Sequence, residues 1–291
     1  MLIGISLVTF GILRSIPGDP VVIMFPNASQ EAVERIRGEL GLNGPLPLQY
    51  LIYVRSAVQG DLGTSIRTRE PVAETLARRL RFTVILTFLS TLLALAIGIA
   101  AGVAAAVNQD TWLDHLITFG AVALVSLPGF WLSLVLLMLF AAQLHLLPAG
   151  GASTPQHFVL PVVVIGLGAA AVIARFTRAS MLDALRQDHI RTVRASGVAE
   201  RLVIYKHALR NALNPVVSVA GLEFGFLLGG TAIVESIFSF PGIGRLMVDA
   251  IYTRDYPMIQ GGILVVAVAV VLVNLATDLC YALVNPRIRY S

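Results

Sequence analysis

Six apolar stretches run along this chain, and more polar segments, some of them rich in arginine, separate them. An α-helix needs about 20 mostly apolar residues to cross a bilayer, so each stretch predicts a membrane-crossing helix. The stretches are Leu2–Ile16, Phe82–Val107, Leu116–Ala142, Phe158–Ala174, Val216–Val234 and Ile259–Val284. The first stretch is shorter than this, so we expect a shortened first helix. The predicted fold class is an all-α integral membrane protein with about six transmembrane helices.

The polar segments divide the chain into three predicted parts. Residues 1–17 form the first transmembrane helix, which Pro17-Gly18-Asp19-Pro20 ends. Residues 18–80 form a water-exposed cap of short amphipathic helices. Residues 81–291 form the transmembrane core, with a polar loop at 181–215 between the fourth and fifth spans. The cap contains no His/Cys cluster and no set of nucleophile and base, so it is not expected to be an enzyme domain.

Small residues and one proline modify the pattern inside the spans. Gly98 and Gly102 lie four residues apart in the second span, a spacing that lets another helix approach closely. Pro128-Gly129 lies in the middle of the third span and predicts a kink there.

Composition supports a membrane protein and excludes several functions. The chain is 56% hydrophobic and 13% charged, whereas a soluble domain is typically about a quarter charged. Its net charge of +4 comes from particular loops, which indicates membrane orientation and not nucleic-acid binding. The single cysteine, Cys280, excludes an intrachain disulfide. No GxxxxGK[ST] phosphate loop occurs, so the chain is not expected to bind ATP in that way.

The most polar segment of the core is Asp188 to Pro215. Ala195-Ser196-Gly197 places small residues and a helix-ending glycine between two helical patterns, which predicts a compact helix-turn-helix. We call residues 188–202 the knob. From this segment alone, a solvated basic loop and a docking site for a partner are both open.

Arginine asymmetry predicts the orientation. The segment from Arg175 to Arg210 carries eight basic and three acidic residues, and Arg287 and Arg289 follow in the tail. Short basic loops stay in the cytoplasm, so the knob and both termini are predicted to be cytoplasmic and the cap external. The acidic segment Asn108–His115 should lie on the same side, although it has no Lys or Arg.

Four polar residues are candidates for a passage through the membrane. A charge in mid-membrane costs roughly 2.5–3.5 kcal/mol on insertion scales, so Glu223 is expected to face water or a partner. It could bind the ammonium group of a peptide or pair with an arginine of a second subunit. Glu235, Asn274 and Asp278 are further candidates, although capping or a structural pair suits Asp278 better.

Other functional classes fit less well. An intramembrane hydrolase needs a nucleophile and base at membrane depth or HExxH, and no histidine lies in a predicted span. A secondary transporter is the stronger rival because of Glu223 and Asp278, but no internal repeat is visible. His145 and His157 flank one outer loop without metal-ligand spacing, and no metal site is predicted.

The segment Asp188–Pro215, which contains the knob, resembles the loop by which permease subunits of type-1 ABC importers contact their ATPases. The general pattern is Glu-Ala-Ala, three residues, Gly, then Ile-x-Leu-Pro, and Gly197 and Leu209 keep its spacing. Arg191-Thr192-Val193, His207 and Arg210 depart from it. These departures resemble the dipeptide, oligopeptide, glutathione and nickel branch, whose version runs roughly Arg-Thr-x-Arg-Ala-x-Gly and then His-x-Leu-Arg-Asn-Ala.

Further matches to that branch extend over nearly the whole chain. They are Pro17-Gly18-Asp19-Pro20, Gly60-Asp61-Leu62-Gly63, the segments Ala174–Asp183 and Glu235–Arg245, Arg254-Asp255-Tyr256-Pro257 and Asn285–Tyr290. The resemblance implies a permease subunit, without enzyme activity of its own, in the cytoplasmic membrane of a bacterium. Peptides are the implied substrate, with nickel or glutathione as the alternative.

The resemblance also implies partners and site residues. The partners are a second homologous permease, two ATP-binding subunits that hold ATP and Mg²⁺, and an external substrate-binding protein. This chain itself would need no cofactor. The implied ATPase-coupling residues are Asp188, Arg191, Arg194, Ala195, Gly197, Glu200 and Arg201.

Overall fold

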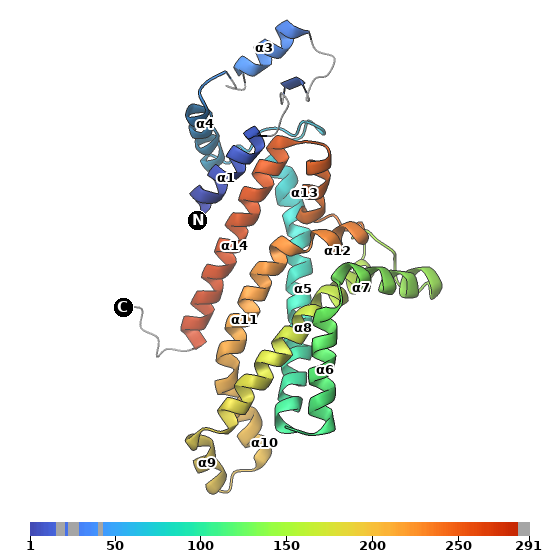
Figure 1. Ribbon diagram of the computed structural model, residues 1–291, viewed down its shortest axis with the longest axis vertical. Helices are drawn as coiled ribbons and strands as arrows, with labels where there is room; N and C mark the ends of the chain where they lie inside the picture. The colour runs from blue at the N-terminus through green and yellow to red at the C-terminus, as the bar shows by residue number, and fades with distance from the viewer. Residues whose placement is uncertain (16–20, 23–28, 40–42, 285–291) are drawn as a thin grey trace. The chain divides into compact units, whose positions relative to one another are not determined.

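The computed structural model describes residues 1–15, 21–22, 29–39 and 43–284, and it is helical almost throughout (Figure 1). Apart from an isolated bridge between Thr64 and Pro71, the described residues contain no β-structure. The helices are α1 Leu2–Ser15, α3 Gln30–Glu39, α4 Leu46–Val58, α5 Val72–Val107, α6 Trp112–Ser126, α7 Gly129–Leu136, η1 Leu137–Gln143, α8 Gln156–Leu185, α9 Asp188–Ala195, α10 Glu200–Leu202, η2 Val203–Ala208, α11 Leu209–Gly230, α12 Ala232–Ile237, α13 Ile243–Tyr252 and α14 Tyr256–Val284.

Four of these helices are long and apolar enough to cross a membrane. They are α5 at Val72–Val107, α8 at Gln156–Leu185, the continuous helix made of α10, η2 and α11 at Glu200–Gly230, and the part Tyr256–Thr277 of α14. The pair α6 and α7–η1 makes a fifth if it is counted as one span, and α1 is a shorter apolar helix. The all-α membrane fold is therefore confirmed, while the count of six spans stays a prediction.

Several predicted bounds need correction. Helix α8 continues past Ala174 to Leu185, and the helix predicted to begin at Val216 begins at Glu200. Helix α11 ends at Gly230, before the predicted Val234, because the chain turns at Thr231. At Pro128 the chain does not merely kink: α6 and α7 are separate helices bent by 97°. A proline lacks the amide hydrogen that would bond to the preceding turn, which explains a break at this position.

The chain forms two compact units, and the first comprises Met1–Thr83 and Pro241–Ala269. Its core holds Val72 and Leu76 of α5 against Ile243 and Ala250 of α13 and Met258 of α14. The buried hydroxyl of Thr83 accepts a 2.9 Å hydrogen bond from the first amide of α13. Helix α13 is therefore tied to the first turns of α5 by apolar packing and by a buried hydrogen bond.

The second unit comprises Val84–Phe240 and Val270–Ser291. Within it α5 and α8 pack closely at the two glycines that the sequence singled out. A Cβ added at Gly98 would lie 2.7 Å from Cγ2 of Ile173, and one at Gly102 would lie 2.6 Å from the carbonyl oxygen of Ala174. Neither distance can accommodate a side chain, so the small-residue pattern marks a real helix contact.

Candidate functional site

The knob forms at the end of the second unit where α8 and α11 approach each other (Figure 1). Helix α9 ends at Ser196, and Gly197 follows with φ of +76°. Its amide donates a 3.0 Å hydrogen bond to the carbonyl of Arg194. A left-handed residue after the last helical turn is the usual place for glycine, because a Cβ there is strained. The helix-turn-helix prediction is confirmed.

An arginine–glutamate pair closes the turn of the knob. Nη2 of Arg194 lies 2.7 Å from Oε1 of Glu200, and Nε donates to both carboxylate oxygens at 3.1 and 3.2 Å. These hydrogen bonds raise the pKa of Arg194 above its ordinary value. Arg191 pairs more loosely with Asp188, at 3.7 Å. The sequence predicted that these four residues contact a partner protein. In the structure they pair with one another, Arg194 with Glu200 and Arg191 with Asp188.

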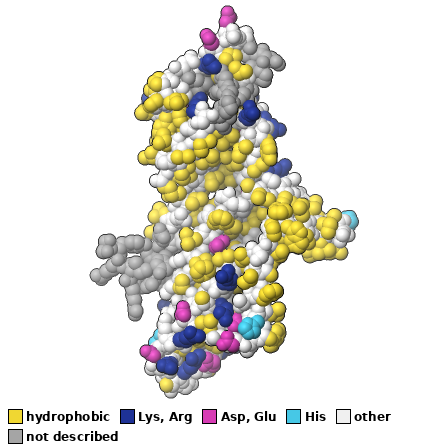
Figure 2. Space-filling model, viewed as in Figure 1, with side chains coloured by type: hydrophobic (Ala, Val, Ile, Leu, Met, Phe, Trp, Pro, Cys, Tyr) yellow, Lys and Arg dark blue, Asp and Glu magenta, His cyan; other side chains and the backbone are white. Residues whose placement is uncertain are grey.

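The outer surface of the knob is exposed. All seven predicted coupling residues are exposed, namely Asp188, Arg191, Arg194, Ala195, Gly197, Glu200 and Arg201. A Cβ at Gly197 would meet nothing within 4 Å. In Figure 2, positive and negative side chains mix at this end of the second unit. Small residues flanked by both charges give a surface on which a partner could approach the backbone closely.

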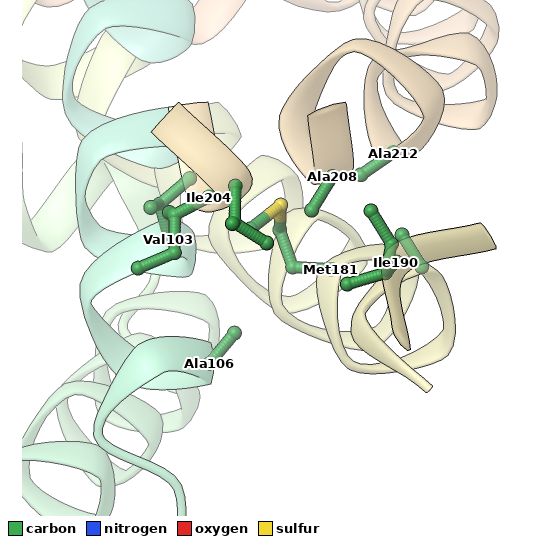
Figure 3. Packing of buried hydrophobic residues seen from close by; sticks show 9 residues of the cluster. Val103, Ala106, Met181, Ile190, Ile204, Ala208 and Ala212 are labelled. Carbon is green, nitrogen blue, oxygen red and sulfur yellow. The ribbon is translucent and has the colours of Figure 1, made fainter. Parts of the chain in front are cut away.

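Beneath that surface the knob is anchored by a buried apolar cluster (Figure 3). Ile190 of α9 is fully buried, and Met181 of α8, Ile204 of η2 and Ala208 belong to the same cluster. Val103, near the end of α5, completes it from a third helix. The side-chain amide of Asn211 and Nε2 of His189 lie 3.0 Å apart and add a polar link from α11 to α9. The knob is thus held by α5, α8 and α11 together.

Of the four predicted passage residues, the structure describes the side chains of Glu223, Glu235 and Asn274. Glu223 is half-buried in α11, and its carboxylate takes part in no hydrogen bond or ion pair with another described residue. Asn274 of α14 lies near Gly225, where a Cβ would be 3.3 Å from Oδ1. Gly221 also faces α14, so Glu223, two positions from each glycine, points away from that helix.

The other two passage candidates are Glu235 and Asp278. Glu235, expected at the outer end of the fifth span, is fully buried in the separate helix α12, and its Oε1 accepts a 3.0 Å hydrogen bond from the hydroxyl of Thr231. The side chain of Asp278 lies outside the described residues, as do the motifs at 17–20 and 285–290. Among the residues described, no three His, Cys, Asp or Glu side chains are grouped as a metal site would need.

Sequence reasoning missed a buried pair that links α6 to α8. Nε and Nη2 of Arg178 lie 2.6 Å from Oδ1 and Oδ2 of Asp114, whose side chain is 1% exposed. The hydroxyl of Thr118 and the amide of Asp110 donate to the same carboxylate. Asp114 had counted against the predicted orientation because its loop lacks basic residues. The positive charge that balances Asp114 comes from Arg178 of α8. The signal available in the sequence was an acidic residue with no basic residue near it in the chain.

Comparisons with known proteins agree with this architecture. The family described as "Binding-protein-dependent transport system inner membrane component" matches residues 98–290. A second family, described as the N-terminal part of such a membrane component, matches residues 1–87. The glutathione transport system permease protein GsiC of Escherichia coli K12 is 46% identical over 288 residues, which cover 99% of this chain and 94% of that protein. GsiC of Shigella dysenteriae serotype 1 matches equally well.

Solved structures show the same fold. The inward-facing MetNI methionine ABC transporter matches with a TM-score of 0.63 at 21% identity, covering 72% of this chain and 96% of that chain. An amino acid ABC transporter solved with histidines matches with a TM-score of 0.52 at 19% identity, covering 74% and 94%. The chain belongs to the family of binding-protein-dependent transport-system inner-membrane components and is a permease subunit of an ABC importer with the type-1 fold.

Proposed function

We propose that this permease forms half of the passage for short peptides, and that glutathione, a tripeptide, is the first substrate to test. The observation that carries the proposal is the 46% identity to glutathione permeases along 99% of the chain. The peptide-branch motifs at Arg191–Gly197 and His207–Ala212 support the same substrate class. Dipeptides and nickel remain the alternatives within the branch.

ATP hydrolysis is assigned to separate subunits that dock on the knob. Gly197 and Ala195 offer an exposed backbone surface, and Ile190 anchors the same helix in the buried cluster. A rigid-body movement of a docked subunit would therefore reach α8 and α11, which the knob joins. The remaining proposed partners are a second permease and an external substrate-binding protein. ATP and Mg²⁺ belong to the ATPase subunits, and this chain contributes no cofactor site.

The knob is assigned to the cytoplasmic side, together with both termini, and the cap to the outside. The basic excess between Arg175 and Arg210 supports this orientation. The pairing of Asp114 with Arg178 removes the acidic loop as a counterexample. A reporter fused after Asn43 should be active only outside the cytoplasm, and a cytoplasmic signal would reverse the assignment.

The decisive experiment is transport by the reconstituted complex. The permease is purified with the subunits that accompany it, placed in liposomes, and supplied with binding protein, ATP and radiolabelled glutathione, a dipeptide or nickel. We expect ATP-dependent uptake of glutathione that exceeds uptake of the other two. Uptake driven by a proton or sodium gradient without ATP would indicate a secondary transporter and contradict the proposal.

Glu223 is proposed to meet the ammonium group of the substrate on the passage. It lies beside the residues of α11 that pack on α5 and α8, Val216 and Ala220, and it is half-buried. Glu223→Gln should reduce uptake of peptides with a free ammonium group and spare N-blocked peptides. Glu74→Gln, at an exposed glutamate of α5, is the control. Equal uptake of all peptides would favour a structural pair with the second permease.

A further inference from the structure

The first unit contains a polar cavity of about 550 Å³ that the proposed transport function does not use. It opens between the cap loop that precedes α5, the first turns of α5, α13 and the start of α14. Both signs of charge and several hydroxyl groups line it. The lining residues on which the argument rests are Arg67, Thr68, Arg79, Phe82, Leu246 and Asp255.

Asp255 fixes the wall of this cavity. The residue is 3% exposed, and its carboxylate accepts a 2.5 Å hydrogen bond from the hydroxyl of Ser65. The backbone amides of Ile66 and Arg67 donate to it as well, at 3.1 and 3.5 Å. These bonds hold the cap loop against the start of α14, so the backbone that carries the Arg67 side chain is held in place.

Each carboxylate at the cavity already has a partner, and two guanidinium groups have none. Glu70 pairs with Arg78 at 2.7 Å and also accepts a hydrogen bond from Thr75. Asp249 lies 4.0 Å from Arg245, and Asp255 is occupied by the loop. The guanidinium groups of Arg67 and Arg79 have no carboxylate or hydrogen-bond partner within the described parts of the chain. Two unpaired guanidinium groups at one cavity predict an oxyanion ligand, because their planar donor forks match phosphate and carboxylate oxygens.

The position of the cavity along α5 indicates which oxyanion ligand it binds. The helix is charged up to Arg81, and its apolar membrane stretch begins at Phe82, which lines the cavity. Leu246 and Met258 add apolar wall beside Phe82. Arg67 and Arg79 thus lie at a cavity that is polar on one side and apolar at the level where the hydrocarbon begins. Phospholipid phosphates lie at this boundary, and long arginine side chains near the ends of membrane helices reach it.

We propose that this cavity binds the phosphate headgroup of an anionic phospholipid. Arg67 and Arg79 donate hydrogen bonds to the phosphate oxygens. Thr68 offers a further hydroxyl donor at the same cavity, since its oxygen accepts from the amide of Glu70 and its hydrogen stays free. Phe82 and Leu246 contact the first carbons of the acyl chains. The bound lipid would tie the cap loop, α5 and α13 together at the membrane surface.

The test is native mass spectrometry of the purified complex titrated with phosphatidylglycerol. We expect the double variant Arg67→Gln/Arg79→Gln to lose at least tenfold in affinity at its tightest lipid site. The control Arg55→Gln/Arg81→Gln removes the same charge from two exposed arginines outside the cavity and should change affinity less than twofold. Arg67→Lys/Arg79→Lys keeps the charge and should retain most of the binding.

A variant that leaves the arginines intact covers the case in which the double variant fails to assemble. Leu246→Trp fills the cavity from its apolar side and should displace the lipid. Unchanged lipid affinity in the Gln double variant and in Leu246→Trp would overturn the proposal, and so would an equal loss in the Arg55/Arg81 control. If glutathione displaced the lipid one for one in the wild type but not in the Gln double variant, the cavity would belong to the carboxylates of the substrate instead.

Discussion

Two arginine–carboxylate pairs in the second unit share a short, forked geometry but lie in opposite surroundings. Arg178 and Asp114 meet at 2.6 Å, and the Asp114 side chain is 1% exposed. Arg194 and Glu200 meet at 2.7 Å with side chains 41% and 56% exposed. Water screens the second pair much more than the first, so the same contact differs greatly in its effect on stability. The buried pair holds helices together, while the exposed pair shapes a surface.

Two glycines of the same unit show the same contrast. Gly102 is needed for space, because α8 leaves no room for a Cβ. Gly197 is needed for its φ of +76° and has open space around it. One glycine therefore belongs to the packed frame, and the other belongs to the face that remains available to a partner. Substitutions in the packed helix contacts should lower folding stability, and substitutions on the exposed surface of the knob should weaken coupling to the ATPase subunits.

The largest expected effect on stability comes from the buried pair. Asp114→Asn leaves the Arg178 charge without its partner and should lower the free energy of unfolding in detergent by about 3 kcal/mol. Arg178 is 29% exposed, so water offsets part of the full cost of an unpaired charge. The control is Asp110→Asn in the same turn, at an exposed side chain, which should change stability by less than about 0.5 kcal/mol. Equal losses in the two variants would show that the pair is not a structural tie.

The next effect concerns the contact between α5 and α8. Gly102→Ala places a methyl group 2.5 Å from Cβ of Thr177 and should cost about 2 kcal/mol of stability, because the helices must separate. Gly120→Ala in α6 is the control, since a Cβ there meets nothing within 4 Å. Thermal unfolding of both variants in detergent measures the difference. A neutral Gly102→Ala would mean that the two helices pack less closely than the structure shows.

These contacts show what the sequence could reveal. Gly98 and Gly102 were visible because four-residue spacing is a local pattern, and Gly197 was visible because glycine ends helices. The pair Asp114–Arg178 was not visible, since its members are 64 positions apart and only tertiary packing brings them together. The 97° break at Pro128 was predicted only as a kink, because a proline does not determine the direction of the next helix.

The passage residues show the other limit of the sequence. A charge in an apolar run identified Glu223 as unusual, but helix α11 turns it away from Asn274. Glu235 was placed at the end of a span by its apolar neighbours. The turn at Thr231 instead buries it in a separate short helix. Apolar runs predict helices well, but which way each polar side chain points depends on the helices packed around it.

A substitution at Gly197 should separate stability from coupling. Gly197→Trp strains the left-handed backbone by about 1 kcal/mol and fills the open space on the knob. We expect only that small loss of stability, with strongly reduced copurification of ATPase subunits or substrate-stimulated ATP turnover. Gly197→Asn is the control, because asparagine tolerates the left-handed region and is smaller. If Gly197→Trp left both assembly and ATP turnover unchanged, the knob would not be the docking site.

The smallest expected effect on stability comes from the exposed pair. A double-mutant cycle of Arg194→Ala and Glu200→Ala should give a coupling energy of about 0.5 kcal/mol in unfolding measurements, decreasing as salt is added. The same cycle on Asp114 and Arg178 should give a larger energy with little salt dependence, because that pair is shielded from water. ATP turnover of the complex provides the second readout. If Arg194 and Glu200 shape the docking surface, each single variant should reduce turnover more than its stability loss explains. A coupling energy above about 2 kcal/mol for the exposed pair would instead show that it stabilises the fold as the buried pair does. The distinction between the two pairs would then fail.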